Sequence, residues 1–307
     1  MDFRQLRTFS CVAELGSLSK ASDTLRVAQP ALSRQIKLLE HELRAELFTR
    51  NGRGMVLTEA GRLLLSRTAG IVRQIDRIRD DIQSSGGAPS GRVVLGLVPT
   101  VSCVISARLA RRTVERYPGI SLCIVESYSG HLIEWLHRGE MDLAVIYGPA
   151  VDLHLTLHGL GRDSIVAVGP RGSGLAQKKR VDIGWLLRQR LVLPSHSHGL
   201  RALIERAAAK RKCKLDVQIE ADSFRVLTSL VEEGLGYTLL PPSSVRHEVA
   251  DGRLETAVVA KSAVVRELTV ASPLDHPGSS AITLITRLLR DETNACRKEG
   301  LWDIKLA

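Results

Sequence analysis

The chain of 307 residues has few of the features that mark membrane, disulfide-bonded or single-strand-binding proteins. No apolar run approaches the roughly 18 residues that a membrane-spanning helix needs. The five cysteines are scattered and form no C-x-x-C pair, which argues against a disulfide framework or a zinc site. Aromatic residues make up only 4% of the chain, which disfavours proteins that stack single-stranded bases on aromatic rings. The first residues, Met1–Leu6, lack the pattern of a signal peptide, so we expect a cytoplasmic protein with no membrane partner.

Positive charge, in contrast, is abundant. The chain has 43 Lys and Arg against 33 Asp and Glu, a formal net charge of +10. This excess favours an anionic partner, with nucleic acid first and an anionic membrane second. Residues 1–88 hold 14 basic and 10 acidic side chains, and the rest hold 29 and 23. Because both parts are basic, the position of individual charges must indicate the binding surface.

The composition changes once along the chain. Residues 1–85 are typical of successive helices, whereas residues 92–295 alternate short apolar runs with helical segments. Small residues and a proline between them, over residues 84–91, predict a linker or hinge. We therefore expect three regions: residues 1–58, a helix with a hinge over residues 59–91, and residues 92–300.

Three short helices are predicted at the N-terminus. The pair Asp2 and Gln5 forms a candidate capping box for the first helix, and Ser17 or Ser19 can cap a second that runs to about Leu25. The third runs from Pro30 to about residue 44, because proline is favoured in the first turn of a helix. Its apolar positions, which we expect to point inward, are Leu32, Ile36, Leu39 and Leu43.

The other face of the third helix is polar and basic. Two short helices joined by a tight turn, with such a face on the second, are suited to reading the major groove of duplex DNA. Gln can pair with adenine and Arg with guanine. The alternative is an ordinary solvated helix face. The candidate DNA-binding residues of the helices are Ser19, Gln29, Pro30, Ser33, Arg34 and Lys37.

A hairpin is predicted next, because Asn51-Gly52 lies between two short apolar runs. Arg50 and Arg53 flank this turn, and a basic hairpin after such helices is suited to phosphate or minor-groove contact as a wing. The alternative is an ordinary surface hairpin.

A long helix follows from Thr58 to about Gln83, with an apolar seam of heptad spacing. We expect this seam to pair two copies of the chain, although such a stripe can also pack against its own domain. The seam consists of Leu64, Thr68, Ile71, Ile75, Ile78 and Ile82.

Residues 92–300 predict an α/β domain with a mainly parallel sheet and helices on both faces. Such sheets bind ligands beyond the carboxyl ends of their strands, near helix N-termini. Hydroxyl and imidazole groups at these places form a cradle for a small anionic or polar metabolite, although each could instead cap a helix. The candidate effector-binding residues are Thr100, Ser102, Ser129, Tyr147, Ser195 and His196.

Catalysis and metal binding have little support in this region. His196 and His198 form a single pair without a third ligand, which is a weak metal motif. Ser195 lies beside them, but no G-x-S-x-G elbow precedes it. We therefore expect neither an enzyme nor a resident cofactor, and only a small-molecule co-inducer.

Several motifs together resemble the LysR-type transcriptional regulators. The N-terminal motifs are Leu6-x-x-Phe9, Gly16-Ser17-Leu18-Ser19-x-Ala21, Gln29-Pro30-Ala31-Leu32-Ser33-Arg34-Gln35-Ile36, Leu39-Glu40, Leu47-Phe48-x-Arg50 and Leu57-Thr58-x-Ala60-Gly61. The C-terminal ones are Pro99-Thr100, Asp142-Leu143-Ala144-Val145-Ile146 and Gly234-x-Gly236-x-x-x-Leu240-Pro241. The resemblance covers nearly the whole chain. Two positions depart from the family pattern, Ala28 where a serine is frequent and Ser22 where an alanine is frequent.

The resemblance implies an α+β multidomain protein. An N-terminal winged helix-turn-helix and a linker helix would precede an effector domain that resembles periplasmic solute-binding proteins. Its subdomain I would comprise residues 92–161 and 267–300, and subdomain II residues 162–266. The family pairs into dimers, usually makes tetramers and contacts RNA polymerase. Ile146-Tyr147 and Trp302 are similar to the branch that contains the nitrogen assimilation control protein.

The sequence thus favours a sequence-specific regulator that binds promoter DNA, with metabolite control through the C-terminal cleft. A second hypothesis is a cytoplasmic solute-binding protein whose N-terminal helices serve only for dimerisation. A third is a metabolic enzyme, for which no convincing catalytic set is present.

Overall fold

The computed structural model describes residues 1–306 except 52–53, 85–88, 149–151, 153, 179, 197, 261–264 and 275–278. The chain divides into two units, Met1–Gly87 with the segment Trp135–Glu140, and Ala88–Glu134 with Met141–Ala307. Half of the linker predicted over residues 84–91, residues 85–88, lies outside the described residues, as does Arg53. In the described ranges, no helix combines the length and the apolar character that crossing a membrane requires.

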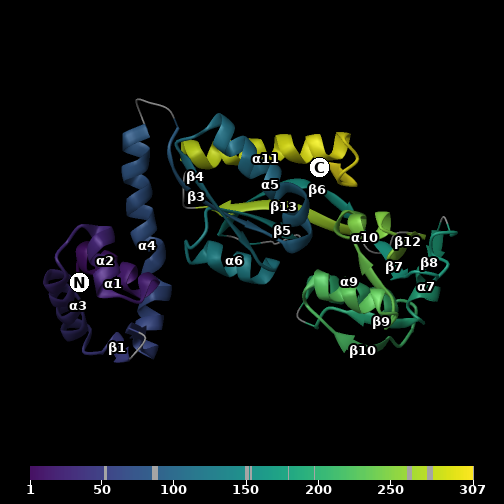
Figure 1. Cartoon of the computed structure of the whole chain (residues 1–307), viewed down its shortest axis with the longest axis horizontal. Coiled ribbons are helices and arrows are strands. Elements are labelled where there is room, and N and C mark those ends of the chain that lie inside the picture. Colours follow the sequence, from purple (N-terminus) through teal and green to yellow (C-terminus); the bar gives the residue numbers. More distant parts are fainter. Residues whose placement is uncertain are drawn as a thin grey trace. The chain divides into compact units, whose positions relative to one another are not determined.

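The first unit consists of three short helices, a hairpin and a long helix (Figure 1). The elements in chain order are α1 (Phe3–Leu15), α2 (Leu18–Leu25), α3 (Gln29–Leu43), β1 (Phe48–Asn51), β2 (Gly54–Leu57) and α4 (Glu59–Ser84). The strands pair antiparallel, with Phe48 opposite Leu57 and Asn51 opposite Gly54. The predicted helix-turn-helix with a wing hairpin is therefore confirmed.

The helix ends follow from local chemistry. Asp2 and Gln5 form the predicted capping box of α1. Ser17 caps α2 by accepting from the backbone N–H of Lys20, so Ser19 is not the cap. Pro30 lies in the first turn of α3, where Ala28 offers no side-chain oxygen for the cap.

One apolar cluster holds these elements together. Phe9, Leu32 and Leu39 are fully buried in it, and Phe9 also packs against the ring of Phe48, with the ring centres 5.3 Å apart. The prediction that Leu43 points inward was wrong, because its side chain is 39% exposed. Leu43 is the last residue of α3, and Arg44 then adopts a left-handed conformation that ends the helix. Leu43 therefore lies at the very end of the helix, where the core does not cover its side chain.

Two glycines allow the hairpin to lie close to the helices. Gly54 has φ +118°, and a Cβ there would lie 2.5 Å from the carbonyl oxygen of Gly16. The next residue, Met55, donates its backbone N–H to that same oxygen at 2.9 Å. On the other side, a Cβ at Gly61 would lie 2.2 Å from the carbonyl oxygen of Leu47. The hairpin is thus fixed between the turn after α1 and the first turn of α4.

The second unit begins with a six-stranded sheet of order β14-β6-β13-β5-β3-β4. The strands in chain order are β3 (Gly91–Leu97), β4 (Ile120–Glu126), β5 (Leu143–Tyr147), β6 (Leu155–Ser164), β13 (Val265–Pro273) and β14 (Ile304–Leu306). In Figure 1, α5 (Pro99–Arg116) and α11 (Ser280–Lys298) lie on one face of this sheet and α6 (Ser129–His137) lies on the other.

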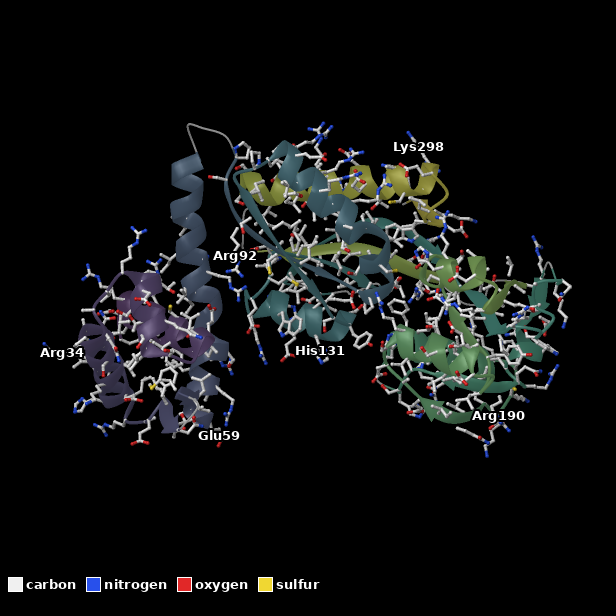
Figure 2. The ribbon with its side chains drawn as sticks, viewed as in Figure 1. Arg34, Glu59, Arg92, His131, Arg190 and Lys298 are labelled. Carbon is white, nitrogen blue, oxygen red and sulfur yellow. The ribbon has the colours of Figure 1, made fainter. Side chains whose placement is uncertain are left out.

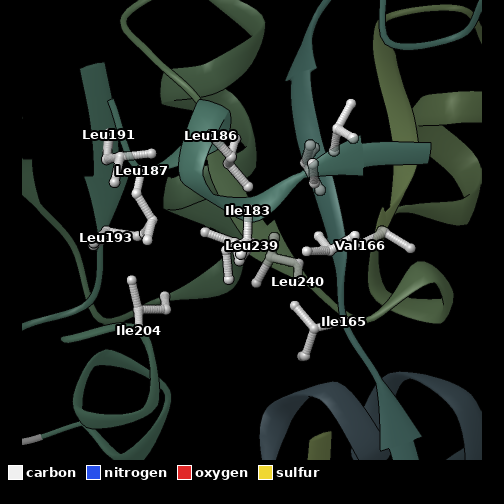
Figure 3. Packing of buried hydrophobic residues seen from close by; sticks show 14 of the residues in the cluster. Ile165, Val166, Ile183, Leu186, Leu187, Leu191, Leu193, Ile204, Leu239 and Leu240 are labelled. Atoms are coloured by element: carbon white, nitrogen blue, oxygen red, sulfur yellow. The ribbon is translucent and has the colours of Figure 1, made fainter. Parts of the chain in front are cut away.

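Smaller sheets form the rest of this unit. A four-stranded sheet has the order β11-β7-β12-β8, and β10 pairs with β9 in parallel. These strands are β7 (Val166–Pro170), β8 (Arg180–Asp182), β9 (Arg190–Leu193), β10 (Asp216–Glu220), β11 (Thr238–Leu240) and β12 (Leu254–Ala260). The helices between them are α7 (Ile183–Leu186), α8 (Gly199–Ala209), α9 (Phe224–Glu232), η1 (Pro242–Val245) and α10 (Arg246–Ala250). A cluster of buried aliphatic side chains packs these elements together, among them Ile183, Leu193 and Leu239 (Figure 3).

The sheets are mixed, so the prediction of a mainly parallel sheet was wrong. In the six-stranded sheet, β13 is antiparallel to both of its neighbours, β6 and β5, and among its described strands only β3 pairs in parallel, with β4 and β5. The long strand β6 was not foreseen, because its glycines and polar residues break the apolar pattern. The chain leaves the six-stranded sheet after Ser164 and returns at Val265, so the predicted subdomain boundaries fall inside β6 and β13.

We expect Gly61→Ala to lower the free energy of unfolding by about 1–3 kcal/mol, because the new methyl group would overlap a backbone oxygen that cannot move freely. The matched control is Gly130→Ala in α6, where a Cβ would meet nothing within 4 Å. That change should be neutral or stabilise by up to about 1 kcal/mol. Urea unfolding of the three proteins measures both effects, and equal stabilities would contradict the close approach.

Candidate functional site

The face of α3 that is turned away from the core carries the predicted DNA-binding residues. Gln29, Arg34 and Lys37 are exposed, and Ser33 is half-buried among them. Figure 2 shows Arg34 projecting outward from the helix. The opposite face holds the buried Leu32 and Ile36, so the polar face has no packing role within its own unit.

Two contacts fix the position of this helix. Ser19 on α2 is exposed and donates to the side-chain oxygen of Gln29 at 3.4 Å, which orients the amide at the start of α3. Behind the exposed face, Thr8 on α1 hydrogen-bonds the side chain of Gln35. The predicted residues Ser19 and Gln29 therefore lie side by side on the same surface, together with the exposed ring of Pro30.

The hairpin continues this surface in the chain. Arg50 lies in β1 and pairs with Met55, but its side chain is outside the described residues, as are Gly52 and Arg53. The wing role of Arg50 and Arg53 thus rests on the sequence and on the observed hairpin.

The long helix α4 exposes an apolar stripe that differs from the predicted seam. Leu63, Ile71 and Ile78 are 60%, 49% and 53% exposed. In contrast, Leu64 packs against the core of the first unit and Thr68 is buried. Leu64 and Thr68 are therefore covered by the chain's own unit near the start of the helix, as a correction to the prediction, whereas Ile71 and Ile78 further along are not. Ile75 is half-buried, and the side chain of Ile82 is outside the described residues. Leu63 was missed because it lies eight residues before Ile71, outside the heptad spacing that selects Leu64.

A cleft of about 930 Å³ lies in the second unit. The first residues of α5, α6, α8 and α9 line it, together with residues of β6 and β13 near the two places where the chain changes sheet. Helix N-termini carry partial positive charge and free N–H groups. The polar and charged lining residues are Thr100, Tyr128, Ser129, His131, Tyr147, Arg162, Asp163, Ser164, His198, Arg206, Asp222, Arg266, Glu267, Asp303 and Lys305.

A buried hydrogen-bonded cluster forms part of this lining. The hydroxyl of Tyr147 lies 2.7 Å from that of Thr100 and 2.9 Å from a carboxylate oxygen of Asp163. Arg266 donates to the same oxygen at 3.1 Å, and its guanidinium lies 3.7 Å from the centre of the Tyr147 ring. Burial raises the pKa of both Tyr147 and Asp163, and the charge of Arg266 opposes this rise. The cluster joins α5, β5, β6 and β13.

Three of the predicted effector residues line the cleft and three do not. Thr100, Ser129 and Tyr147 line it, and Ser129 accepts the backbone N–H of Tyr147 at 3.0 Å. Ser102 is buried two residues further along α5, where a helix turns a side chain to another face. The other two, Ser195 and His196, are described next.

Only some residues of the segment before α8 line the cleft. Ser195 is absent from the lining, and its backbone N–H donates to Asp222 at 2.9 Å. His196 is exposed and lies 2.8 Å from a carboxylate oxygen of Glu205, outside the cleft. His198 does line the cleft, where its Nδ1 accepts the backbone N–H of Leu200 at 3.1 Å and its ring packs edge-on against Tyr128.

Sequence reasoning missed Asp163 and Arg266, which are both nearly fully buried. These residues are 103 positions apart in the chain and meet because β6 pairs with β13, where Arg266 lies opposite Asp163. No local pattern could have joined them. The sequence indicated this pair only in that each of the two charged residues lies in a segment that forms a strand.

The charged groups that line the cleft are only partly engaged by the chain itself. Among the described residues, no three His, Cys, Asp or Glu side chains gather closely enough to hold a metal ion. The acids of the lining are engaged by the chain itself: Asp163 by Tyr147 and Arg266, Asp222 by Ser195, Glu267 by Arg162 and Asp303 by Ser164. In contrast, within the described part of the chain Arg206 and Lys305 form no ion pair, so the lining offers free positive charge.

Two segments of the chain match known protein families. Residues 86–294 match the family described as "LysR substrate binding domain", and residues 3–62 match "Bacterial regulatory helix-turn-helix protein, lysR family". The chain is 30% identical over 302 residues to the HTH-type transcriptional regulator BbuR of Bordetella bronchiseptica, covering 98% of this chain and 93% of that protein. It is 31% identical over 247 residues to the nitrogen assimilation regulatory protein nac of Escherichia coli, covering 80% of each.

A solved structure shares the fold. A full-length variant of OxyR from Pseudomonas aeruginosa superimposes with a TM-score of 0.75 at 23% identity, covering 96% of this chain and 98% of that one. At this identity the likeness concerns the fold: an N-terminal helix-turn-helix unit and a C-terminal α/β unit.

The imidazole of His198 should make stability depend on pH. Burial, reinforced by the charge of Arg266 and opposed by Asp222, holds the pKa of His198 below its ordinary 6.5. The unfolded chain therefore takes up a proton more readily than the folded one, and stability is lost as the pH falls below about 6.5. Protonation also removes the acceptor that caps α8. We expect urea unfolding to become easier between about pH 7.5 and 5.5, with a slope below about 1.4 kcal/mol per pH unit from this group.

The matched variant is His198→Asn, because an asparagine oxygen can cap a helix and does not titrate in this range. The variant should lose part of the pH dependence while keeping most of the stability at pH 7.5. Identical pH profiles for the parent chain and the variant would show that His198 does not contribute.

Proposed function

Because the chain belongs to the LysR family of DNA-binding transcriptional regulators, we propose that it reads promoter DNA through the exposed face of α3. It is a regulator rather than a solute-binding protein or a metabolic enzyme. The observation that supports this interface best is the polar face of α3, which is exposed beside a hairpin and has no packing role.

In this proposal, α3 enters the major groove and the hairpin follows the DNA backbone. Gln29 and Arg34 have the donors and acceptors that pair with base edges, whereas Lys37 suits a phosphate. Ser19, Pro30 and Ser33 complete the contact surface on the helices. Arg50 and Arg53 of the hairpin add phosphate or minor-groove contacts.

Two copies of the chain pair through α4. The exposed stripe of Leu63, Ile71 and Ile78 lies along a helix of 26 residues, which is long enough for a two-helix seam. Pairing presents two copies of α3 to successive half-sites, and two dimers can then form a tetramer. The DNA-bound assembly contacts RNA polymerase.

The cleft holds the co-inducer, a small anionic or polar metabolite. Free positive charge at Arg206 and Lys305, together with the converging helix N-termini, favours an anionic group. The Tyr147–Asp163–Arg266 cluster lies where the chain changes sheet, so a ligand there contacts both parts of the effector domain. A ligand shifts the assembly only if it binds two of its shapes with different affinity. The similarity to a nitrogen assimilation regulator makes nitrogen-related promoters the first targets to examine by genome-wide mapping.

Titration of duplex DNA at several salt concentrations tests the interface. We expect Arg34→Ala to reduce the preference for a selected promoter fragment over random DNA, by about 1–3 kcal/mol, because it removes a base contact. Arg53→Ala should weaken binding to both DNAs alike and reduce the salt dependence, because it removes a phosphate contact. Fluorescence anisotropy measures both effects.

Two outcomes of this titration would contradict the assignment. Equal loss of discrimination in both variants would refute the division of roles between Arg34 and Arg53. If no promoter fragment bound better than random DNA, the sequence-specific interface itself would be wrong.

The exposed stripe of α4 should determine assembly. Ile71→Lys places a charge in the centre of the seam, so we expect the dimer to dissociate at protein concentrations where the parent chain is paired. Ser66→Lys is the control, since it puts the same charge on a face of the helix that Ile71 and Ile78 do not share. Sedimentation velocity distinguishes the two. An unchanged oligomer in Ile71→Lys would mean that another surface pairs the chains.

A further inference from the structure

Glu40 on α3 holds the start of the hairpin. One of its carboxylate oxygens accepts the backbone N–H of Leu47 at 2.8 Å and that of Phe48 at 3.3 Å. These N–H groups begin the segment that becomes β1. Both hydrogen bonds share one oxygen of this side chain. The side chain of one element thus determines where another element starts.

The hairpin needs such an anchor because it is short. Each strand has four residues, and an isolated two-stranded hairpin of this size is marginally stable. Its other end is held by the bond from Met55 to Gly16, and the carbonyl of Leu47 accepts the backbone N–H of Thr58 at 3.0 Å. Of these backbone anchors, the one through Glu40 comes from α3, the helix that carries the DNA-binding face.

Glu40 also belongs to the row of residues that faces DNA. Ser33, Lys37 and Glu40 follow one another at helical spacing, and all three line a hollow of about 210 Å³ between α3 and the hairpin. A free carboxylate in this row would repel phosphates. One oxygen of this acid is instead turned to two N–H groups of the chain itself, which directs it to the hairpin.

We propose that Glu40 is a positioning residue that couples the hairpin to α3, so that helix and wing meet DNA in one fixed arrangement. This role requires an acceptor oxygen at the right distance from the helix to meet the N–H groups of Leu47 and Phe48. The negative charge of the side chain is secondary. The inference goes beyond the DNA contacts proposed above, since it assigns Glu40 a contact with the hairpin and none with a base or phosphate.

Two substitutions separate reach from charge. Glu40→Gln keeps an oxygen at the same distance from the helix and loses the charge, whereas Glu40→Asp keeps the charge and withdraws the oxygen by one methylene. We expect amide hydrogen exchange at Leu47 and Phe48 to become about tenfold faster in Glu40→Asp and to stay within about twofold in Glu40→Gln. This measurement uses the full chain without DNA.

DNA binding then tests the coupling. The probe is a duplex selected from random sequence by the parent chain, titrated at several salt concentrations. Glu40→Asp should bind it about tenfold more weakly, with the slope of log affinity against log salt reduced by about 1, because the wing loses a phosphate contact. Glu40→Gln should bind like the parent chain. The control is Glu42→Gln, which makes the same charge change two residues further along α3, where the acid is paired with the N-terminal amine.

Three results would overturn the proposal. Unchanged amide exchange in Glu40→Asp would show that the anchor does not hold the hairpin. Faster exchange with unaltered affinity and salt slope would show that the hairpin position does not matter to DNA binding. Weaker binding of Glu40→Gln than of Glu40→Asp would show that the charge, and not the reach of the oxygen, is what counts.

Discussion

Burial of one apolar stripe on each helix is the constraint on which the first unit depends. A helix that turns Leu32, Ile36 and Leu39 into a common core must leave its opposite face outside. The residues on that face of α3 are therefore available for a partner, whatever their chemistry. On α4 the core covers Leu64 near the start of the helix and leaves Ile71 and Ile78, further along the same side, exposed. Both candidate surfaces of this unit, the polar face of α3 and the apolar stripe of α4, thus consist of residues that the core leaves uncovered.

Precise docking of the hairpin turns this core into a binding unit. Its backbone approaches the helices at Gly54 and Gly61, where side chains would not fit, and Glu40 binds its first N–H groups. A short hairpin without such anchors would sample many orientations relative to α3. The glycines and the acid therefore position the hairpin beside the exposed face of α3.

Antiparallel pairing of β6 with β13 has the corresponding role in the second unit. It brings together two strands that lie beside the changes from one sheet to the other, and it places Asp163 against Arg266. A buried ion pair is costly to desolvate and needs good partners. Here Tyr147 donates a hydrogen bond to Asp163, and its ring lies against the guanidinium of Arg266. These contacts offset part of the desolvation cost of the pair. The cluster therefore links the strands on which the chain passes from one sheet to the other.

Local patterns in the sequence determined most of the first unit, because helix caps, helical spacing and a hairpin turn act over a few residues. The capping box at Asp2, the apolar stripe of α3 and the turn after Asn51 are of this kind. Tertiary structure decided the rest. Only packing distinguishes Leu63 from Leu64 and leaves Leu43 uncovered, and only strand pairing joins Asp163 to Arg266 over 103 residues. Thr100, Ser129 and Tyr147 could be found from strand ends, whereas the direction of Ser102 and His196 depends on neighbours distant in the chain. The physical reason is that spacing along the chain fixes which residues share a face, but not which other element covers that face.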